Sequence, residues 1–391
     1  MIMKAVLTSS THPEYGEISI PFPIPEEEYD QTIELLEGLG IGDVFAQDCR
    51  IIKLESAYPV LDRLEGSAVN LDELDYLAKR LESFCEREDT QFQAMAHKLE
   101  LTDIKDLINL SFCCQDTTVI TDFSDLEEIG REHRINRGGL TADEYYSIDG
   151  RAAALELIRS GSGTITPYGV VYDNGMELKQ FYDGQSFPPY LYKVPIIELK
   201  TTSGGGLEGH FDLPMPDRRL QREIERTGLD RQDIPLKVEL SGLRGAAAGA
   251  LDLEGLMVSD LPQLNRLCRA VEPLTEQDWE KLDAVVRFAV RSDFATLCRL
   301  AENLDLFDFV PNVHTAEEYG KYLIQKSGKF AYDAKLRDIY DYRGFGEDRV
   351  WQEDGCFTEC GYVAYHGTEL LEELIPGAPT EEQGMQMGGL S

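Results

Sequence analysis

The chain has 391 residues, and its 72 acidic against 37 basic side chains give a formal net charge of −35 at pH 7. A hydrophobic content of 42% excludes a disordered chain, and the length indicates two or more domains. No apolar run approaches the length of a membrane span and no apolar segment follows a basic start, so we expect a cytoplasmic protein.

Residues 1–65 predict a piece of mixed α and β structure. Residues 4–8 and 17–22 read as two strands of a hairpin, and two prolines then end the second strand. The helix expected next is crowded with acids: Glu26, Glu27, Glu28, Asp30, Glu34 and Glu37. Acids in the first turn stabilise a helix dipole, which accounts for three of them and leaves the others unexplained.

A helical piece is expected at 66–135, where apolar residues recur every three or four positions. Asn70 with Glu73 three residues later predicts the start of its first helix, and Ser124 with Glu127 predicts the start of its last. Further acids surround both starts: Asp72 and Asp75 at the first, Asp122, Asp125 and Glu128 at the second.

Residues 136–190 predict a small α+β piece and a link. Thr141 with Glu144 indicates a short helix, and a Ser-Gly loop precedes a single strand at 164–172. The hairpin pattern then begins again in a piece at 191–258, with strands at 192–200 and 207–213 around Gly204–Gly206. Its helix, from Asp217 to about Thr227, has arginines where the first copy has acids: Arg218, Arg219, Arg222 and Arg226.

The rest of the chain predicts a second helical piece, a closing α+β piece and a tail. The helical piece spans 259–325, with cap pairs at Thr275 and Asp278 and at Thr315 and Glu318. The closing piece spans 326–376 and contains one last strand at 356–363. Residues 377–391 are rich in Gly, Gln and Met and include a proline, a composition that predicts a flexible tail.

The two halves repeat one another. A shift of 190 positions places the apolar residues of 71–130 on apolar residues of 261–320 without a gap, including the loops, which unrelated helices have no reason to share. We therefore predict an α+β fold: an elongated chain built from a tandem repeat of hairpin, acidic helix, small helical bundle and closing strand.

The acidity is concentrated on parts of this repeat. Residues 1–150 carry 32 acids and 12 bases, residues 151–250 carry 13 and 12, and residues 251–391 carry 27 and 13. A general solubility bias would spread the charge more evenly, so we interpret these two blocks as functional.

The eight cysteines include no CxxC pair, and the six histidines stand far from them in sequence. Cys268 and Cys298 fall at apolar helical spacing, which favours buried free thiols. We therefore expect no metal site and no cofactor.

Three stretches near the end carry a resemblance to a known family: residues 316–323 (AEEYGKYL), 339–348 (IYDYRGFGED) and 355–363 (GCFTECGYV). They resemble the ArdA antirestriction proteins of plasmids and conjugative transposons. The resemblance covers about 190–375, and the first half joins it mainly through the repeat. Short members of the family correspond to one half of this chain, so we expect either a monomer with two pseudo-equivalent halves or a homodimer.

The resemblance implies a protein that mimics duplex DNA and occupies the DNA groove of type I restriction-modification enzymes, contacting their methyltransferase and specificity core. It implies no catalytic residue, no enzymatic activity, and no binding to nucleic acid or membrane. The carboxylates that we expect to contact the partner are Glu26, Glu27, Glu28, Asp30, Glu34, Asp72, Glu73, Asp75, Asp122, Asp125, Glu127, Glu128, Asp305, Asp308, Glu317, Glu318, Asp338, Asp341, Glu347 and Asp348.

The charge of the chain agrees with this expectation. Duplex DNA carries one negative charge per roughly 1.7 Å of axis, so 35 net charges equal about 60 Å of duplex. Helical carboxylates four residues apart have Cβ atoms about 5 to 6 Å apart, which is similar to the phosphate spacing along one strand.

Two other functions compete with DNA mimicry. A metal-dependent nuclease is suggested by the acid-x-Lys triplets Glu198-Leu199-Lys200, downstream of Asp183, and Glu177-Leu178-Lys179, after Asp173. Such triplets are common by chance, and the sequence contains no phosphate loop, HExxH or GxSxG motif. The second alternative is an acidic adaptor that binds or regulates a protein of a mobile genetic element.

Overall fold

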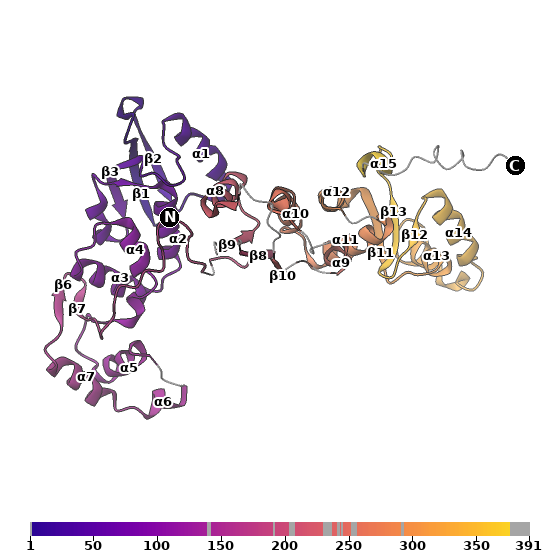
Figure 1. Ribbon diagram of the computed structural model, residues 1–391. Helices are drawn as coiled ribbons and strands as arrows, with labels where there is room; N and C mark the ends of the chain where they lie inside the picture. The colour runs from indigo at the N-terminus through magenta and orange to yellow at the C-terminus, as the bar shows by residue number, and fades with distance from the viewer. Residues whose placement is uncertain are drawn as a thin grey trace. The chain divides into compact units, whose positions relative to one another are not determined.

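The protein is described by a computed structural model that covers residues 2–138, 142–190, 192–202, 208–229, 237–240, 243, 245–251, 256–290 and 293–375. Helices and four small antiparallel sheets make up these residues, which confirms the α+β class (Figure 1). The chain forms two compact units: unit 1 comprises residues 1–194 and 216–230, and unit 2 comprises 195–215 and 231–391. In the part of the chain that is described, no helix is both long and apolar enough to cross a membrane.

Unit 1 begins with a four-stranded sheet in the order β2-β1-β3-β4. Its strands are β1 (Met3–Ser9), β2 (Glu17–Phe22), β3 (Cys49–Ser56) and β4 (Ala68–Val69), and helix α1 (Tyr29–Gly38) follows β2. Strand β1 pairs with β2 from Met3 opposite Phe22 to Thr8 opposite Glu17, as the predicted hairpin requires. Strands β3 and β4 were not predicted.

Three helices bury their apolar stripes in the same core as this sheet. They are α2 (Leu71–Glu82), α3 (Glu86–Lys98) and α4 (Ile104–Leu110). Leu7 of the sheet, Ile33 of α1 and Leu74 of α2 are all fully buried in this one cluster. The predicted pieces 1–65 and 66–135 therefore share a core, because neither a small sheet nor three short helices can bury an apolar face alone.

The second part of unit 1 is a three-stranded sheet, in the order β5-β7-β6, with its own small core. Its elements are β5 (Thr118–Ile120), α5 (Leu126–Asn136), α6 (Ala142–Ser147), α7 (Gly150–Arg159), β6 (Thr164–Thr166) and β7 (Gly169–Tyr172). The residue that caps α5 is Asp125 and not Ser124: its carboxylate accepts the backbone N–H groups of Glu127 and Glu128.

In the described residues, unit 2 consists of helices and two three-stranded sheets. Its elements are β8 (Ile197–Thr202), β9 (Glu208–Leu213), β10 (Lys237–Leu240), α9 (Gly245–Ala250), α10 (Leu261–Val271), α11 (Glu276–Ala289), α12 (Phe294–Glu302), β11 (Phe307–Pro311), α13 (Ala316–Gln325), α14 (Tyr342–Gln352), β12 (Cys356–Phe357), β13 (Gly361–Tyr365) and α15 (Leu371–Leu374). The sheet orders β9-β8-β10 and β11-β13-β12 match β2-β1-β3 and β5-β7-β6.

Single-turn 3-10 helices connect many of these elements. They are η1 (Pro13–Tyr15), η2 (Glu26–Glu28), η3 (Pro59–Leu64), η4 (Cys114–Asp116), η6 (Val258–Asp260), η7 (Leu304–Leu306) and η8 (Ala334–Leu336). Thr275 and Thr315 cap α11 and α13 as predicted, each accepting the backbone N–H of its partner acid. Thr141, Gly204–Gly206 and the tail at 377–391 lie outside the described residues.

The predictions of one strand at 164–172 and one at 356–363 were wrong, because each segment is a hairpin. In the first, the Thr166 hydroxyl donates to the Gly169 carbonyl over 2.8 Å, and in the second Thr358 donates to Gly361 over 2.9 Å. Both glycines have positive φ, 127° and 149°, which a residue with a side chain rarely adopts. The threonine and the glycine therefore form a turn in the middle of a segment whose β propensity favours one continuous strand.

The structure also divides the piece predicted at 191–258. Its hairpin, β8 and β9, belongs to unit 2, whereas its helix α8 (Asp217–Thr227) packs in unit 1. The reason lies in the arginines of α8, which are described with the site below.

Helices α5 and α7 cross at two glycines, Gly130 and Gly150, where a Cβ on Gly130 would overlap the Gly150 carbonyl oxygen. Gly130→Ala should therefore lower the free energy of unfolding by about 1 to 3 kcal/mol, as overpacking does. Gly38→Ala, at the exposed end of α1 with open space around it, is the matched control and should be neutral or slightly stabilising. Denaturant unfolding measures both, and equal effects would contradict the close crossing.

Candidate functional site

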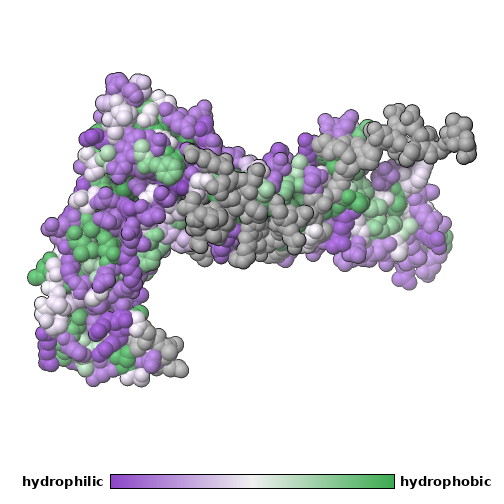
Figure 2. Space-filling model, viewed as in Figure 1, coloured by the Kyte–Doolittle hydropathy of each residue, from purple (hydrophilic) through white to green (hydrophobic). Residues whose placement is uncertain are grey.

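The structure places fifteen of the twenty predicted carboxylates on the surface. The exposed ones are Glu26, Glu27, Glu28, Glu34, Asp122, Asp125, Glu128, Asp305, Asp308, Glu317, Glu318, Asp338, Asp341, Glu347 and Asp348. Asp30, Asp72 and Glu127 are half-buried, and Glu73 and Asp75 are buried. On the visible face in Figure 2, hydrophilic residues cover most of the coloured surface, interrupted by small apolar patches.

The acidic N-terminal segment of α1 is the most open of the predicted clusters. Tyr29, Ile33 and Leu36 bury one side of the helix, and this spacing of four and three leaves the acids on the other side. Among the described residues, the carboxylates of Glu27, Glu28 and Glu34 make neither a hydrogen bond nor an ion pair, while that of Glu26 lies 3.5 Å from the Lys193 ammonium. These carboxylates hold no local structure together and are available to a partner.

The prediction that Asp72, Glu73 and Asp75 form a surface cluster was wrong, because these acids of α2 are directed inward. Asp72 receives two hydrogen bonds from the Arg222 guanidinium, at 2.9 and 3.0 Å, and Asp75 receives one from Arg219 at 2.6 Å. Glu73 and Asp75 flank the stripe of leucines by which α2 faces the core, whereas Asp72 lies on another side of the helix and is covered by Arg222 of α8.

Helix α8 supplies the arginines that neutralise these acids. Arg219, Arg222 and Arg226 lie three and four residues apart, so they form one stripe, and their side chains are 3 to 11% exposed. Asp30 of α1 caps this helix by accepting the backbone N–H groups of Asp217 and Arg218, and Glu37 accepts two hydrogen bonds from the Arg218 guanidinium. Asp30 is therefore engaged in fixing α8.

Arg226 is the most deeply embedded of the four. Its guanidinium donates to Tyr182 Oη and Asn70 Oδ1, both at 2.9 Å, and also to the Val44 carbonyl, and it stacks 4.5 Å from the Phe187 ring centre. Tyr182 in turn donates to Glu73 Oε1 over 2.9 Å. One arginine thus joins the cap of α2 to the segment that follows β7.

Burial changes the ionisation of the inward acids. It raises the pKa of Glu73, whose second carboxyl oxygen has no hydrogen-bond partner, and it raises the pKa of Asp75, a change that the Arg219 guanidinium opposes. Unpaired carboxylates at these positions would be costly to bury, so the arginines of α8 are required by the fold.

The cluster at 122–128 has structural tasks as well as charge. Asp122 accepts the hydroxyl and backbone N–H of Ser124, and these hydrogen bonds hold its pKa below the usual range. Glu127 accepts the backbone N–H groups of Gly150 and Arg151 and so caps the neighbouring helix α7. Only Glu128 is directed outward without a backbone partner among the described residues.

The acids of unit 2 fall into two groups. Asp305, Asp308 and Asp348 are exposed, and their carboxylates make no hydrogen bond or ion pair with any described residue. The others are engaged locally: Glu318 and Asp341 cap α13 and α14, and Glu317, Asp338 and Glu347 form ion pairs with Lys321, Arg337 and Arg343.

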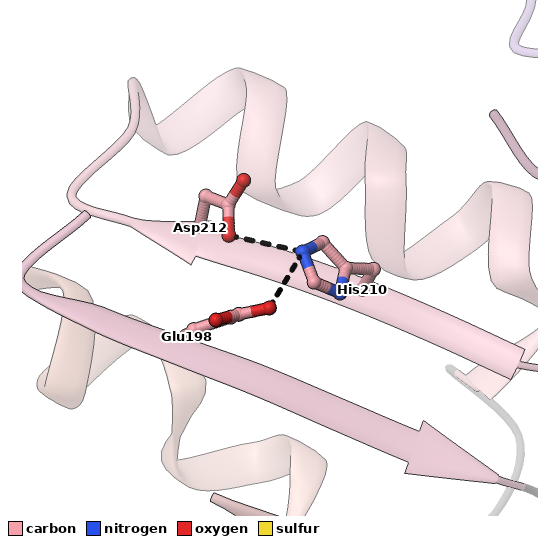
Figure 3. A group of neighbouring side chains, drawn as sticks. All are labelled: Glu198, His210 and Asp212. Atoms are coloured by element: carbon pink, nitrogen blue, oxygen red, sulfur yellow. Dashed lines mark ion pairs between the residues drawn. The ribbon is translucent and has the colours of Figure 1, made fainter. Parts of the chain in front are cut away.

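The residues proposed for a nuclease do not form one cluster within either unit. Glu198 and Lys200 are neighbours on β8 in unit 2, whereas Asp183 belongs to unit 1, and Asp173 of unit 1 is paired with Lys98 at 2.6 Å. What the sequence analysis missed is that β9 brings His210 and Asp212 to Glu198 (Figure 3). Their alternation, His210-Phe211-Asp212, indicated that both side chains share one side of a strand, but the register that adds Glu198 was not visible.

Comparison of the chain with protein-family models and with curated proteins gave no match.

Arg226 offers the sharpest test of the inward cluster. Arg226→Met keeps most of the side-chain volume but removes the guanidinium donor from the Val44 carbonyl, Tyr182 Oη and Asn70 Oδ1, so the free energy of unfolding should fall by about 3 to 5 kcal/mol. Arg343→Met, which removes an exposed arginine paired with Glu347, should leave stability nearly unchanged. Denaturant unfolding compares the two variants. Similar losses in the free energy of unfolding would show that burial does not determine how much each arginine contributes to stability.

Proposed function

We propose that this protein is an antirestriction protein, which presents carboxylates in place of DNA phosphates and blocks the DNA-binding groove of a type I restriction-modification enzyme in the cytoplasm. The observation that supports this proposal most is the sorting of its acids. Those that face inward are matched by the arginines of α8, whereas Glu27, Glu28, Glu34, Asp305, Asp308 and Asp348 are exposed and unpaired among the described residues.

The physical case rests on the cost of such a surface. Exposed like charges repel one another and stabilise nothing in the fold, so a chain with a net charge of −35 carries them against its own stability. A protein groove that binds DNA is lined by Lys and Arg side chains, which neutralise the phosphates and release the cations condensed on the duplex. Carboxylates at a similar spacing can occupy the same groove for the same electrostatic reason.

This mode of action predicts competition with DNA. The protein should displace duplex DNA from a type I methyltransferase core. Raising the salt concentration should weaken the complex between the inhibitor and the enzyme, because salt screens the attraction between carboxylates and the basic groove as it screens that between phosphates and the groove. Fluorescence anisotropy of labelled DNA measures the displacement. DNA that stays fully bound at saturating protein and low salt would contradict DNA mimicry and favour an acidic adaptor for another protein.

The acids of the N-terminal segment should carry part of this inhibition. Replacing Glu27, Glu28 and Glu34 by Gln removes three exposed charges that have no local partner, so inhibition should weaken while the melting temperature stays equal or rises slightly. The matched control replaces Glu17, Glu86 and Glu177, three exposed acids outside the predicted clusters, by Gln. Both variants have a net charge of −32, since three of the 35 excess charges are removed. Equal inhibition by the two variants would assign the effect to total charge and not to position.

A further inference from the structure

Three metal-ligating side chains gather on one side of the hairpin β8–β9 in unit 2. Glu198 of β8 lies directly opposite Asp212 of β9, and His210 precedes Asp212 by two residues. Because side chains alternate along a strand and directly opposed residues share a side, all three project to the same side of the hairpin. Figure 3 shows the imidazole of His210 directed toward both carboxylates.

The separations within this group are close to those of a coordination sphere. His210 Nε2 lies 3.1 Å from Asp212 Oδ1 and 3.5 Å from Glu198 Oε1, and one ligand atom from each residue falls within 4.8 Å of the others. Ligands bound at about 2.0 to 2.2 Å around a tetrahedral ion lie about 3.3 to 3.6 Å from one another. The separation of the nitrogen from Glu198 Oε1 falls within this range, and its separation from Asp212 Oδ1 is slightly shorter.

We propose that Glu198, His210 and Asp212 bind one divalent transition-metal ion, in the first place Zn²⁺. One imidazole nitrogen and two carboxylate oxygens form a ligand set that Zn²⁺ accepts, and three protein ligands leave a fourth position for water. The side chains are 23 to 38% exposed, so an ion can enter from solvent without a change of fold. This site is independent of the proposed DNA mimicry.

The fold does not need this cluster. The opposite side of the same hairpin is held by apolar residues, with Ile197, Leu199, Phe211 and Leu213 fully buried. The hairpin of unit 1 forms with the same antiparallel pairing although it has Lys4 opposite Pro21 and Val6 opposite Ser19 on its strands. A second hairpin could therefore carry any polar side chains there, and it carries three that can share a cation.

Two charges compete with a metal for the cluster. The Lys200 ammonium lies 3.1 Å from Glu198 Oε1, and a proton on His210 Nε2 occupies the lone pair that a metal would use. The hydrogen bond to Asp212 raises the pKa of His210 and so favours the protonated ring. Zn²⁺ has to displace a proton at Nε2 and the Lys200 ammonium beside Glu198.

Metal titration of the full chain tests the proposal. The protein is freed of metal with a chelator, and isothermal titration with Zn²⁺ at moderate ionic strength should show one site per chain. His210→Gln and Asp212→Asn should each lower the affinity for Zn²⁺ at least about tenfold. Mutation of a residue that only hydrogen-bonds to a metal ligand already costs about tenfold in affinity, and loss of the ligand itself costs more. Both positions are partly exposed, and an unchanged melting temperature without metal shows that the variants fold.

His12→Gln is the matched control. His12 Nδ1 also lies 3.1 Å from a carboxylate, that of Glu14, but both side chains are at least half exposed and no third ligand joins them among the described residues. Zn²⁺ binding should be unchanged in this variant. A parent protein that binds no more Zn²⁺ than His210→Gln would overturn the site.

Co²⁺ absorption separates this site from the cysteines. Nitrogen and oxygen ligands give visible d–d bands, whereas thiolates add an intense charge-transfer band in the near ultraviolet. The expected spectrum lacks the thiolate band and disappears in His210→Gln. A thiolate band that persists in that variant would assign the metal to cysteines and overturn the proposal.

Discussion

The fold of unit 1 depends on the pairing between the arginines of α8 and the carboxylates that α2 buries. An apolar stripe draws α2 into the core together with Glu73 and Asp75, and the packing of α8 covers Asp72. Buried carboxylates are tolerated only with partners, and Arg219, Arg222 and Arg226 provide them. This single constraint explains why a helix whose sequence belongs to the second half packs in unit 1.

Two equivalent backbone contacts, one in each unit, have a charged acceptor in unit 1 and a neutral one in unit 2. In unit 1 the N–H of Ile24, between two prolines, donates to Asp75, and in unit 2 the N–H of Met215, also between two prolines, donates to Asn265. A neutral amide is sufficient to accept this hydrogen bond and also donates back to the Met215 carbonyl. The carboxylate at 75 is therefore explained by Arg219, which it binds in addition.

Local patterns predicted from the sequence were reliable where one chain segment determines the structure. The first hairpin, the apolar stripes of α2 and α10 and the caps at Asn70, Thr275 and Thr315 depend on residues a few positions apart. Strands β3 and β4, the turns at Thr166 and Thr358, and the inward direction of Asp75 depend on distant partners or on one glycine. One signal for the arginine cluster was present: Asp72 and Asp75 are three residues apart, as are Arg219 and Arg222. Only the packing of α8 against α2 shows that these two arginines lie opposite these two aspartates.

The exposed acids differ in how firmly they are held, and this bears on mimicry. Asp125, Glu318 and Asp341 accept backbone N–H groups at helix starts, and such hydrogen bonds hold the pKa of Glu318 below its usual range. Their carboxylates are therefore fixed in position, like phosphates on a duplex. Glu27, Glu28 and Glu34 lack such restraints and would lose side-chain entropy on binding. Fixed carboxylates can thus set the register of a DNA-like surface, while unrestrained ones adapt to the arginines and lysines of the groove that they meet.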